Sequence, residues 1–193
     1  MKLRQIRMGA TPASHLHYAS DWRSIPVMRR KSFQKMHCPI ARSLERVGEW
    51  WSMLILRDAL HGYTRFEEFR ESLGVAPHIL TTRLARLVED GFLEKRQYSA
   101  RPPRYEYVPT QRGRDFRPVL LSLMAFGNRH FAPEGAMVQV VNTKTGKPAD
   151  IGVFDRATGL PIAAPDYAMV PGPAANARIR KRYARRTVEA GAA

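Results

Sequence analysis

Polar and basic side chains recur along residues 77–90 at a spacing that places them on one side of a helix. The five side chains on or beside this face are His78, Thr81, Thr82, Arg83 and Arg86. Imidazole, hydroxyl and guanidinium groups form hydrogen bonds with phosphate oxygens and with base edges in the major groove of DNA. Leucines at positions 80, 84 and 87 predict that the opposite face is buried. The segment is therefore predicted to be a helix that presents a DNA-binding face.

A second group of basic side chains lies on a predicted β-hairpin. Residues 92–98 and 104–108 have the composition of two short strands, and the segment between them contains two consecutive prolines. The arginines of this hairpin are Arg96, Arg101 and Arg104. Placed beside a helix in the major groove, they would reach phosphates or the adjacent minor groove.

The elements that must position these side chains begin at residue 63. Phe66, Phe69 and Leu73 form a helical stripe, and Thr64 and Glu67 have the spacing of a capping box. Gly74 is predicted to end this first helix, and the second helix opens with a proline at a position where its missing N–H does no harm. Two short helices, a tight turn and a hairpin predict a winged helix-turn-helix.

The rest of the chain is organised around this unit. Residues 39–49 are predicted to form a helix with Ile40, Leu44 and Val47 inward, and residues 50–60 a central apolar helix. The apolar stripe of a long helix at 114–131 is wider than so small a domain requires, which predicts a homodimer through this helix, with help from residues 39–49. The predicted fold class is mainly α with a small β-hairpin wing (α+β).

Four segments are predicted in all. They are a flexible basic arm (1–36), a DNA-binding and dimerisation domain (37–132), a small β-hairpin appendage (133–165) and a flexible basic tail (166–193). The appendage rests on a repeat, because Thr145-Gly146-Lys147-Pro148 returns as Thr158-Gly159-Leu160-Pro161.

Composition limits the remaining functions. A net charge of +15 and a pI near 10.7 indicate a polyanionic partner such as nucleic acid, although basic tails on an ordinary solvated surface would give the same numbers. A single cysteine, Cys38, excludes an intrachain disulfide and a cysteine-cluster zinc site, and we expect neither metal nor cofactor. The chain has no apolar run long enough to cross a membrane, and we expect it in the cytoplasm.

Two other classes of function compete with specific DNA binding. An enzyme with Cys38 as its nucleophile would need a base and an orienting group, and no motif supplies them, so we expect no enzymatic activity. A sequence-independent basic nucleic-acid-binding or architectural protein is the alternative, which a footprint without sequence preference would favour.

Residues 38–131 resemble the HxlR-type helix-turn-helix transcriptional regulators, which are related to the MarR-like winged helices. The matching blocks are CPIARSLERVGEWWSMLILRDAL, RFEEFRESLGVAPHILTTRLARLVEDGFLEKRQY and PPRYEYVPTQRGRDFRPVLLSLMAFGNRHF. The resemblance implies a homodimer on a pseudo-palindromic operator, with residues 77–90 in the major groove and the wing (93–108) at the adjacent minor groove. It places the protein with the nucleoid when DNA is bound.

The same resemblance bears on Cys38. Some members of the family sense oxidants or electrophiles through a cysteine just before the first core helix, and Cys38 has the matching position. A free cysteine is otherwise most often a small core hydrophobe, so both interpretations stay open. Any small-molecule or oxidant effector is unknown. At the start of the recognition helix the chain has Ala76 where many members have serine, which removes a side-chain cap.

Overall fold

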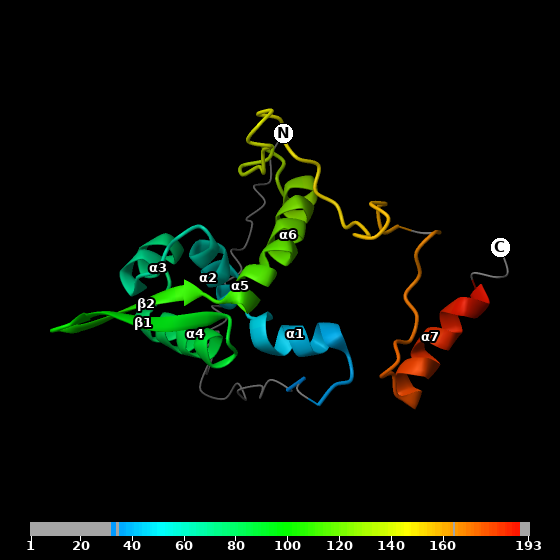
Figure 1. Ribbon diagram of the computed structural model, residues 1–193, viewed down its shortest axis with the longest axis horizontal. Helices are drawn as coiled ribbons and strands as arrows, with labels where there is room; N and C mark the ends of the chain where they lie inside the picture. Colours follow the sequence, from blue (N-terminus) through cyan, green and yellow to red (C-terminus); the bar gives the residue numbers. More distant parts are fainter. Residues whose placement is uncertain (1–31, 34, 164, 190–193) are drawn as a thin grey trace, which may run out of the picture. The chain divides into compact units, whose positions relative to one another are not determined.

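The computed structural model describes residues 32–33, 35–163 and 165–189. Most of the predicted N-terminal arm lies outside this part of the chain. The elements in order are α1 (Pro39–Val47), α2 (Trp50–Leu60), α3 (Phe66–Leu73), α4 (Pro77–Glu89), β1 (Leu93–Ala100), β2 (Pro103–Pro109), α5 (Gln111–Asp115), α6 (Arg117–His130) and α7 (Ala177–Glu189) (Figure 1). The mainly helical fold with one antiparallel hairpin confirms the predicted winged helix-turn-helix.

The hydrophobic core gathers around α2, which contacts α1, α3, α4, α6 and the second wing strand. Ile55 and Leu56 of α2 are completely buried, as are Phe69 of α3 and the three α4 leucines at 80, 84 and 87. Leu93 closes the core at the start of the wing. Burial of several large apolar side chains at 1.5–3 kcal/mol each is what holds these short helices together.

The turn between α3 and α4 forms as the sequence predicts, with one correction at the start of α3. Gly74 ends α3 with a left-handed φ of +60°, a conformation that costs glycine nothing. The capping carboxylate is Glu68 rather than Glu67, because the helix begins one residue later than expected. Glu68 Oε2 accepts hydrogen bonds from the backbone N–H groups of Thr64 and Arg65, both at 2.8 Å.

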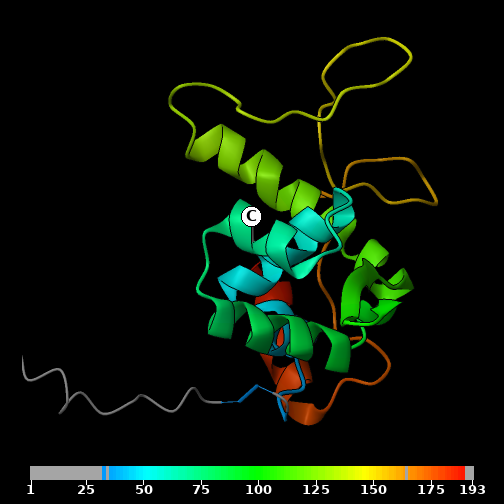
Figure 2. The same cartoon turned by 90° about the vertical axis from the view of Figure 1, so that its left-hand side faces the viewer.

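The wing is a two-stranded antiparallel hairpin in which Leu93 pairs with Pro109 and Ala100 with Pro103. The strands are longer than predicted and leave only residues 101–102 at the tip. The backbone N–H of Tyr107 donates to Thr64 O at 2.7 Å, which ties the wing to the start of α3. In Figure 2, α4 lies below α3, and the wing lies beside the C-terminal end of α4.

The predictions for two helices need correction. In α1, Val47 is buried, but Ile40 is 69% exposed and Leu44 is 39% exposed, so the inward face is narrower than its periodicity indicates. The helix predicted at 114–131 is divided into α5 and α6 at Phe116, where Pro118 occupies the first turn of α6 and cannot donate to a preceding carbonyl.

The region after α6 forms two similar tight turns. Asn142 and Asp155 hold equivalent positions: the N–H of Gly146 donates to Asn142 O, and that of Gly159 donates to Asp155 O, each at 2.7 Å. Isolated β-bridges close the two loops, in agreement with the predicted hairpins. The segment predicted to be a flexible tail contains the helix α7.

Candidate nucleic-acid interface

The outer face of α4 carries three of the predicted side chains. Leu80, Leu84 and Leu87 are fully buried on one side of the helix, and His78, Thr81 and Thr82 are exposed on the opposite side. The two threonine hydroxyls donate to helix carbonyls, Thr81 Oγ1 to Pro77 O at 2.9 Å and Thr82 Oγ1 to His78 O at 2.8 Å. Each hydroxyl oxygen then has lone pairs left for a donor, and each threonine methyl group is available for apolar contact.

Arg83 has a different position. It is half-buried, and its Nη2 lies 3.2 Å from Glu49 Oε2, at the residue that precedes α2. This ion pair joins the recognition helix to the central helix. The ion pair with Glu49 indicates that Arg83 helps to hold α4 in place. The predicted contact of Arg83 with DNA would require this ion pair to break.

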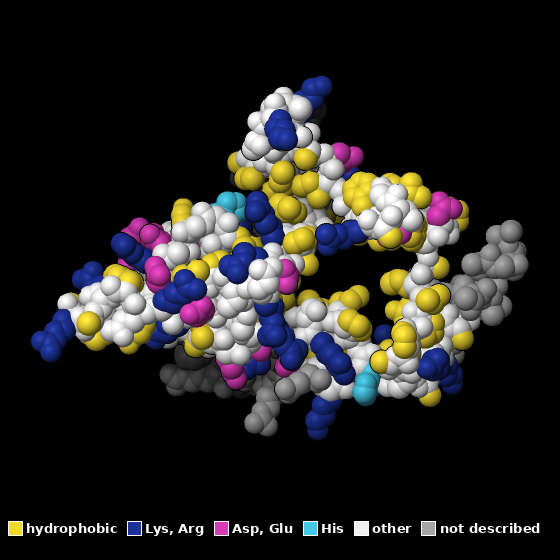
Figure 3. Space-filling view, viewed as in Figure 1, with side chains coloured by type: hydrophobic (Ala, Val, Ile, Leu, Met, Phe, Trp, Pro, Cys, Tyr) yellow, Lys and Arg dark blue, Asp and Glu magenta, His cyan; other side chains and the backbone are white. Residues whose placement is uncertain are grey.

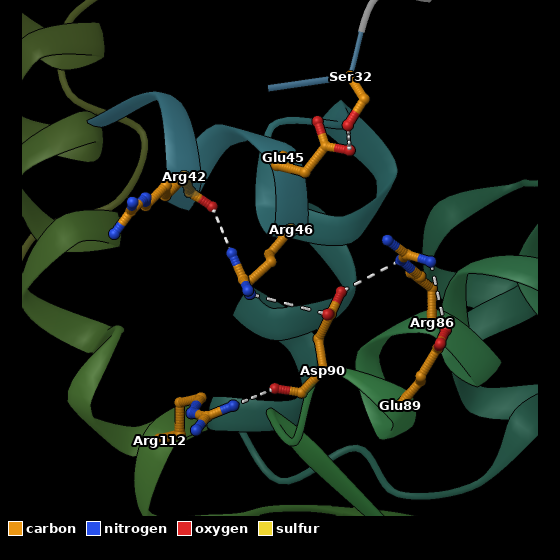
Figure 4. Close-up of polar contacts among 8 residues, drawn as sticks. All are labelled: Ser32, Arg42, Glu45, Arg46, Arg86, Glu89, Asp90 and Arg112. Carbon is orange, nitrogen blue, oxygen red and sulfur yellow. Dashed lines mark hydrogen bonds and ion pairs between the residues drawn. The ribbon is translucent and has the colours of Figure 1, made fainter. Parts of the chain in front are cut away.

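Arg86 lies at the C-terminal end of α4, in a cluster around Asp90 (Figure 4). Its Nε is 3.2 Å from Asp90 Oδ2 and its Nη1 is 3.3 Å from Glu89 Oε2. Arg46 of α1 approaches the other Asp90 oxygen at 3.8 Å, and Arg112 donates to the Asp90 backbone carbonyl. The side chain of Asp90 is only 14% exposed, whereas that of Arg86 is 46% exposed. One carboxylate thus ties α1 to the end of α4, and Arg86 keeps an exposed edge.

The arginines of the wing divide into two kinds. Arg96 Nη2 lies 2.9 Å from Glu94 Oε2 on the same strand, so its charge is partly neutralised. Arg101 lies at the tip and Arg104 is near it on β2; both are exposed, and neither has an ion pair among the described residues. They are the wing cations most available to a phosphate.

Sequence reasoning missed two cations that the fold places over aromatic rings of the wing. The ammonium of Lys95 lies 4.0 Å from the centre of the Tyr105 ring, and the guanidinium of Arg65 lies 5.2 Å from that of Tyr98. Such contacts hold a cation over an aromatic face. The spacing of Lys95 and Tyr105 across the hairpin could have signalled the first pair, but the second joins different elements and has no local signal.

The winged helix-turn-helix surface carries mixed charges. Figure 3 shows lysine and arginine side chains spread along the wing and the helices behind it, with acidic side chains between them. Acidic side chains of this unit pair with Arg83, Arg86 and Arg96. Among the described residues, the cations of the wing that have neither an ion pair nor an aromatic partner are Arg101 and Arg104.

Cys38 precedes α1 and is partly exposed. The backbone N–H of Ala41 in the first turn, with that of Ile40 and the guanidinium of Arg182, lowers the pKa of the Cys38 thiol, and desolvation opposes this shift. The thiolate is therefore more populated at neutral pH than in an ordinary cysteine, which favours reaction with oxidants.

The described part of the chain contains no group of three or more histidine, cysteine or acidic side chains that could hold a metal ion. Within the same residues, every helix is too short or too polar to cross a membrane.

Comparison with known proteins supplies the context for this geometry. A model of the HxlR-like helix-turn-helix family matches residues 46–135. An HTH-type transcriptional regulator of Mycobacterium bovis is 36% identical over 141 residues, which cover 72% of this chain and 89% of the relative. The similarity thus extends beyond the segment that the family model covers.

Two solved structures are also similar. A Pseudomonas aeruginosa protein assigned as a transcription factor is 52% identical with a TM-score of 0.56, over 75% of this chain and 99% of the other. A second protein with the same assignment is 38% identical with a TM-score of 0.65, over 74% of this chain and 100% of the other.

Proposed function

Because the chain belongs to the HxlR-like helix-turn-helix family of transcriptional regulators, we propose that it acts as a homodimer on a pseudo-palindromic operator. In this proposal α4 lies in the major groove and the wing lies at the adjacent minor groove. The main observation that supports this placement of α4 is its outer face, where His78, Thr81 and Thr82 are exposed opposite three fully buried leucines. Such a regulator would work in the cytoplasm, at the nucleoid.

The chemistry of this face favours particular contacts. The two threonine hydroxyls donate to the helix backbone, so their oxygens are placed to accept from the amino groups of adenine or cytosine. Their methyl groups would suit the methyl group of thymine. His78, one turn nearer the start of α4, would reach a phosphate or a base edge. Arg86 would contribute its exposed edge, and Arg83 would help only by fixing the helix.

Selection from a pool of random-sequence duplexes with the full chain tests the proposal. We expect enrichment of an inverted repeat whose half-site centres lie about one helical turn, ~34–36 Å, apart. A pool that shows no enrichment while binding remains tight would refute operator recognition. That result would favour the sequence-independent architectural function instead.

Matched variants separate the helix from the wing. Thr81→Ala/Thr82→Ala should narrow the gap between the selected operator and random DNA, because base contacts discriminate by ~1–3 kcal/mol. Arg101→Ala/Arg104→Ala should weaken both duplexes equally and lower the slope of log K against log salt by about two units. Lys144→Ala/Lys147→Ala removes the same charge from exposed positions outside the winged helix and should change neither quantity. Wing variants that lose only operator preference would reverse these assignments.

The proposed dimer interface rests on exposed apolar side chains. Val119, Leu123 and Phe126 recur along one side of α6 and are 51%, 52% and 53% exposed. Ile40 and Trp50, which belong to α1 and to the start of α2, are also largely exposed. Figure 3 shows hydrophobic side chains gathered over α6. Exposed apolar surface of this extent is typical of a contact with another subunit.

Analytical ultracentrifugation decides the oligomeric state. We expect a dimer at micromolar concentration for the wild type, and a monomer for Leu123→Glu. Ser72→Glu places the same charge at an exposed position of α3, outside the proposed interface, and serves as the control. A wild-type monomer that still prefers the operator would overturn the proposed dimer but not the DNA-binding function.

We further propose that Cys38 senses oxidants. Its partial exposure and its place at the first turn of α1, where the backbone N–H groups lower the thiol pKa, support this role. Diamide with a small thiol, which converts an accessible thiolate into a mixed disulfide, should change the operator affinity of the wild type and leave Cys38→Ser unaffected. Equal responses from both proteins would contradict it.

A further inference from the structure

The positive charge of this chain is concentrated outside the winged helix. Residues 38–131 contain fifteen lysines and arginines against eleven acids, a net charge of only +4 for the whole domain. The helix α7 has six lysines and arginines against one glutamate, a net charge of +5 in 13 residues. One short helix therefore carries a third of the net charge of +15.

The helix α7 has two distinct faces. Ile179 and Tyr183, four residues apart, are half-buried, and residues 169–171 line a shallow hollow with Arg180, Tyr183 and Ala184. Tyr183, on the apolar side of the helix, thus faces the segment that precedes it. Asn176 caps the start, since its Oδ1 accepts a hydrogen bond from the N–H of Ile179 at 3.0 Å.

The other side of α7 is basic and exposed. Its described cations are Arg178, Lys181 and Arg182, and Arg180, which lines the hollow, is exposed as well. Among the described residues none of the four has an ion pair with a carboxylate, in contrast to Arg83, Arg86 and Arg96 of the winged helix. An uncompensated basic surface of this kind attracts a polyanion, and it gains the entropy of the counterions released from phosphate.

We infer that α7 is a second DNA-contacting element, which binds the phosphate backbone of the duplex held by α4 and the wing. The inference rests on the proposed function, because it takes DNA as the polyanion. Arginine and lysine on an exposed helix face bind phosphates without reading bases, so α7 supplies affinity and the outer face of α4 supplies preference. The low net charge of the winged helix itself explains why the regulator needs such an element.

A membrane surface is the competing partner, since amphipathic basic helices also bind anionic lipids. The apolar side of α7 argues against it. The sequence of the helix contains no tryptophan, phenylalanine or leucine, and its central apolar side chains, Ile179 and Tyr183, are already half-buried. Little apolar area is left for insertion among lipid chains.

The experiment compares two double variants of the full chain that lose the same charge. Arg178→Ala/Lys181→Ala alters the basic face and spares Arg182, which lowers the pKa of the Cys38 thiol. Lys144→Ala/Lys147→Ala, in the first hairpin after α6, is the matched control. Binding of each protein to the selected operator and to random DNA is measured over a salt series, and circular dichroism checks the helix content.

We expect the α7 variant to lower the salt slope by about two units on both duplexes, and to weaken binding at 0.1 M salt by up to about tenfold per lost contact. The ratio of operator to random affinity should stay the same. The control should keep the wild-type slope. An α7 variant with an unchanged slope overturns the inference, even if operator preference proves the proposed function correct.

Two other results would also be decisive. Loss of the operator-to-random ratio in the α7 variant would make α7 a base-reading element and overturn the inference. Wild-type binding to vesicles of phosphatidylglycerol and phosphatidylethanolamine that is lost in the α7 variant, with an unchanged DNA slope, would assign the helix to a membrane surface. Failure of the wild type to prefer any sequence is a failure of the proposed function, and the salt slopes still test α7 separately.

Discussion

The carboxylate of Asp90 offers a direct test of how the recognition helix is held. Asp90→Asn keeps the size of the side chain but removes its charge, and so weakens the ion pairs with Arg86 at 3.2 Å and with Arg46 at 3.8 Å. Exposed ion pairs contribute ~0–1 kcal/mol each. Because Asp90 itself is only 14% exposed, we expect values near the upper end and a total loss of about 1–2 kcal/mol in the free energy of unfolding.

Urea denaturation followed by circular dichroism measures this loss. In thermal denaturation of a domain of about 90 residues, each kcal/mol corresponds to a decrease of roughly 4–8 °C in Tm. Asp115→Asn is the control, because Asp115 is exposed and accepts a hydrogen bond from Gln111. The difference between the two variants should shrink in 1 M salt, where the Debye length falls to ~3 Å.

DNA binding gives a second readout for Asp90→Asn. The substitution releases Arg86 and removes a negative charge from the end of α4, so we expect random DNA to bind at least as tightly as it does to the wild type. Equal stability of Asp90→Asn and Asp115→Asn would refute the proposed contribution of the ion pairs. Weaker binding to random DNA would show that Asp90 orients Arg86 for DNA.

Three further substitutions have outcomes that follow from the structure. Leu84→Ala, at a completely buried position of α4, should lower the free energy of unfolding by about 2–5 kcal/mol in urea denaturation. Gly113→Ala should prevent normal folding, judged by near-UV circular dichroism, because an added Cβ would overlap the backbone carbonyl oxygen of Phe92. Glu68→Gln should cost about 1 kcal/mol at pH 7. Two backbone N–H groups lower the pKa of the Glu68 carboxyl in the folded protein. Its contribution to the free energy of unfolding is therefore present above the pKa of the unfolded state and is lost as pH falls through the pKa of the folded state. The difference in stability between Glu68→Gln and the wild type should vanish in acid.

The sequence by itself determined the local elements of this protein. The stripes of α3 and α4, the glycine after α3, the proline that opens α4 and the paired strands of the wing all act over a few residues, so their periodicity and turn chemistry are readable without the fold. The exposed face of α4 with His78, Thr81 and Thr82 followed from the same spacing. The tandem turns at Asn142 and Asp155 were visible as a repeat for the same reason.

Only the tertiary structure decided which of the charged side chains remain available to bind DNA. Arg83, Arg86 and Arg96 look equivalent in the sequence, but Arg86 and Arg96 pair with acids only two to four positions away, whereas Arg83 pairs with an acid of another element. The partner of Arg83 lies 34 positions away, at Glu49, and Arg46 reaches Asp90 from a separate helix. Helical periodicity also could not show that Ile40 is left exposed, since that depends on which neighbours cover α1. Pairings between distant elements depend on how the core packs, and no local pattern encodes them.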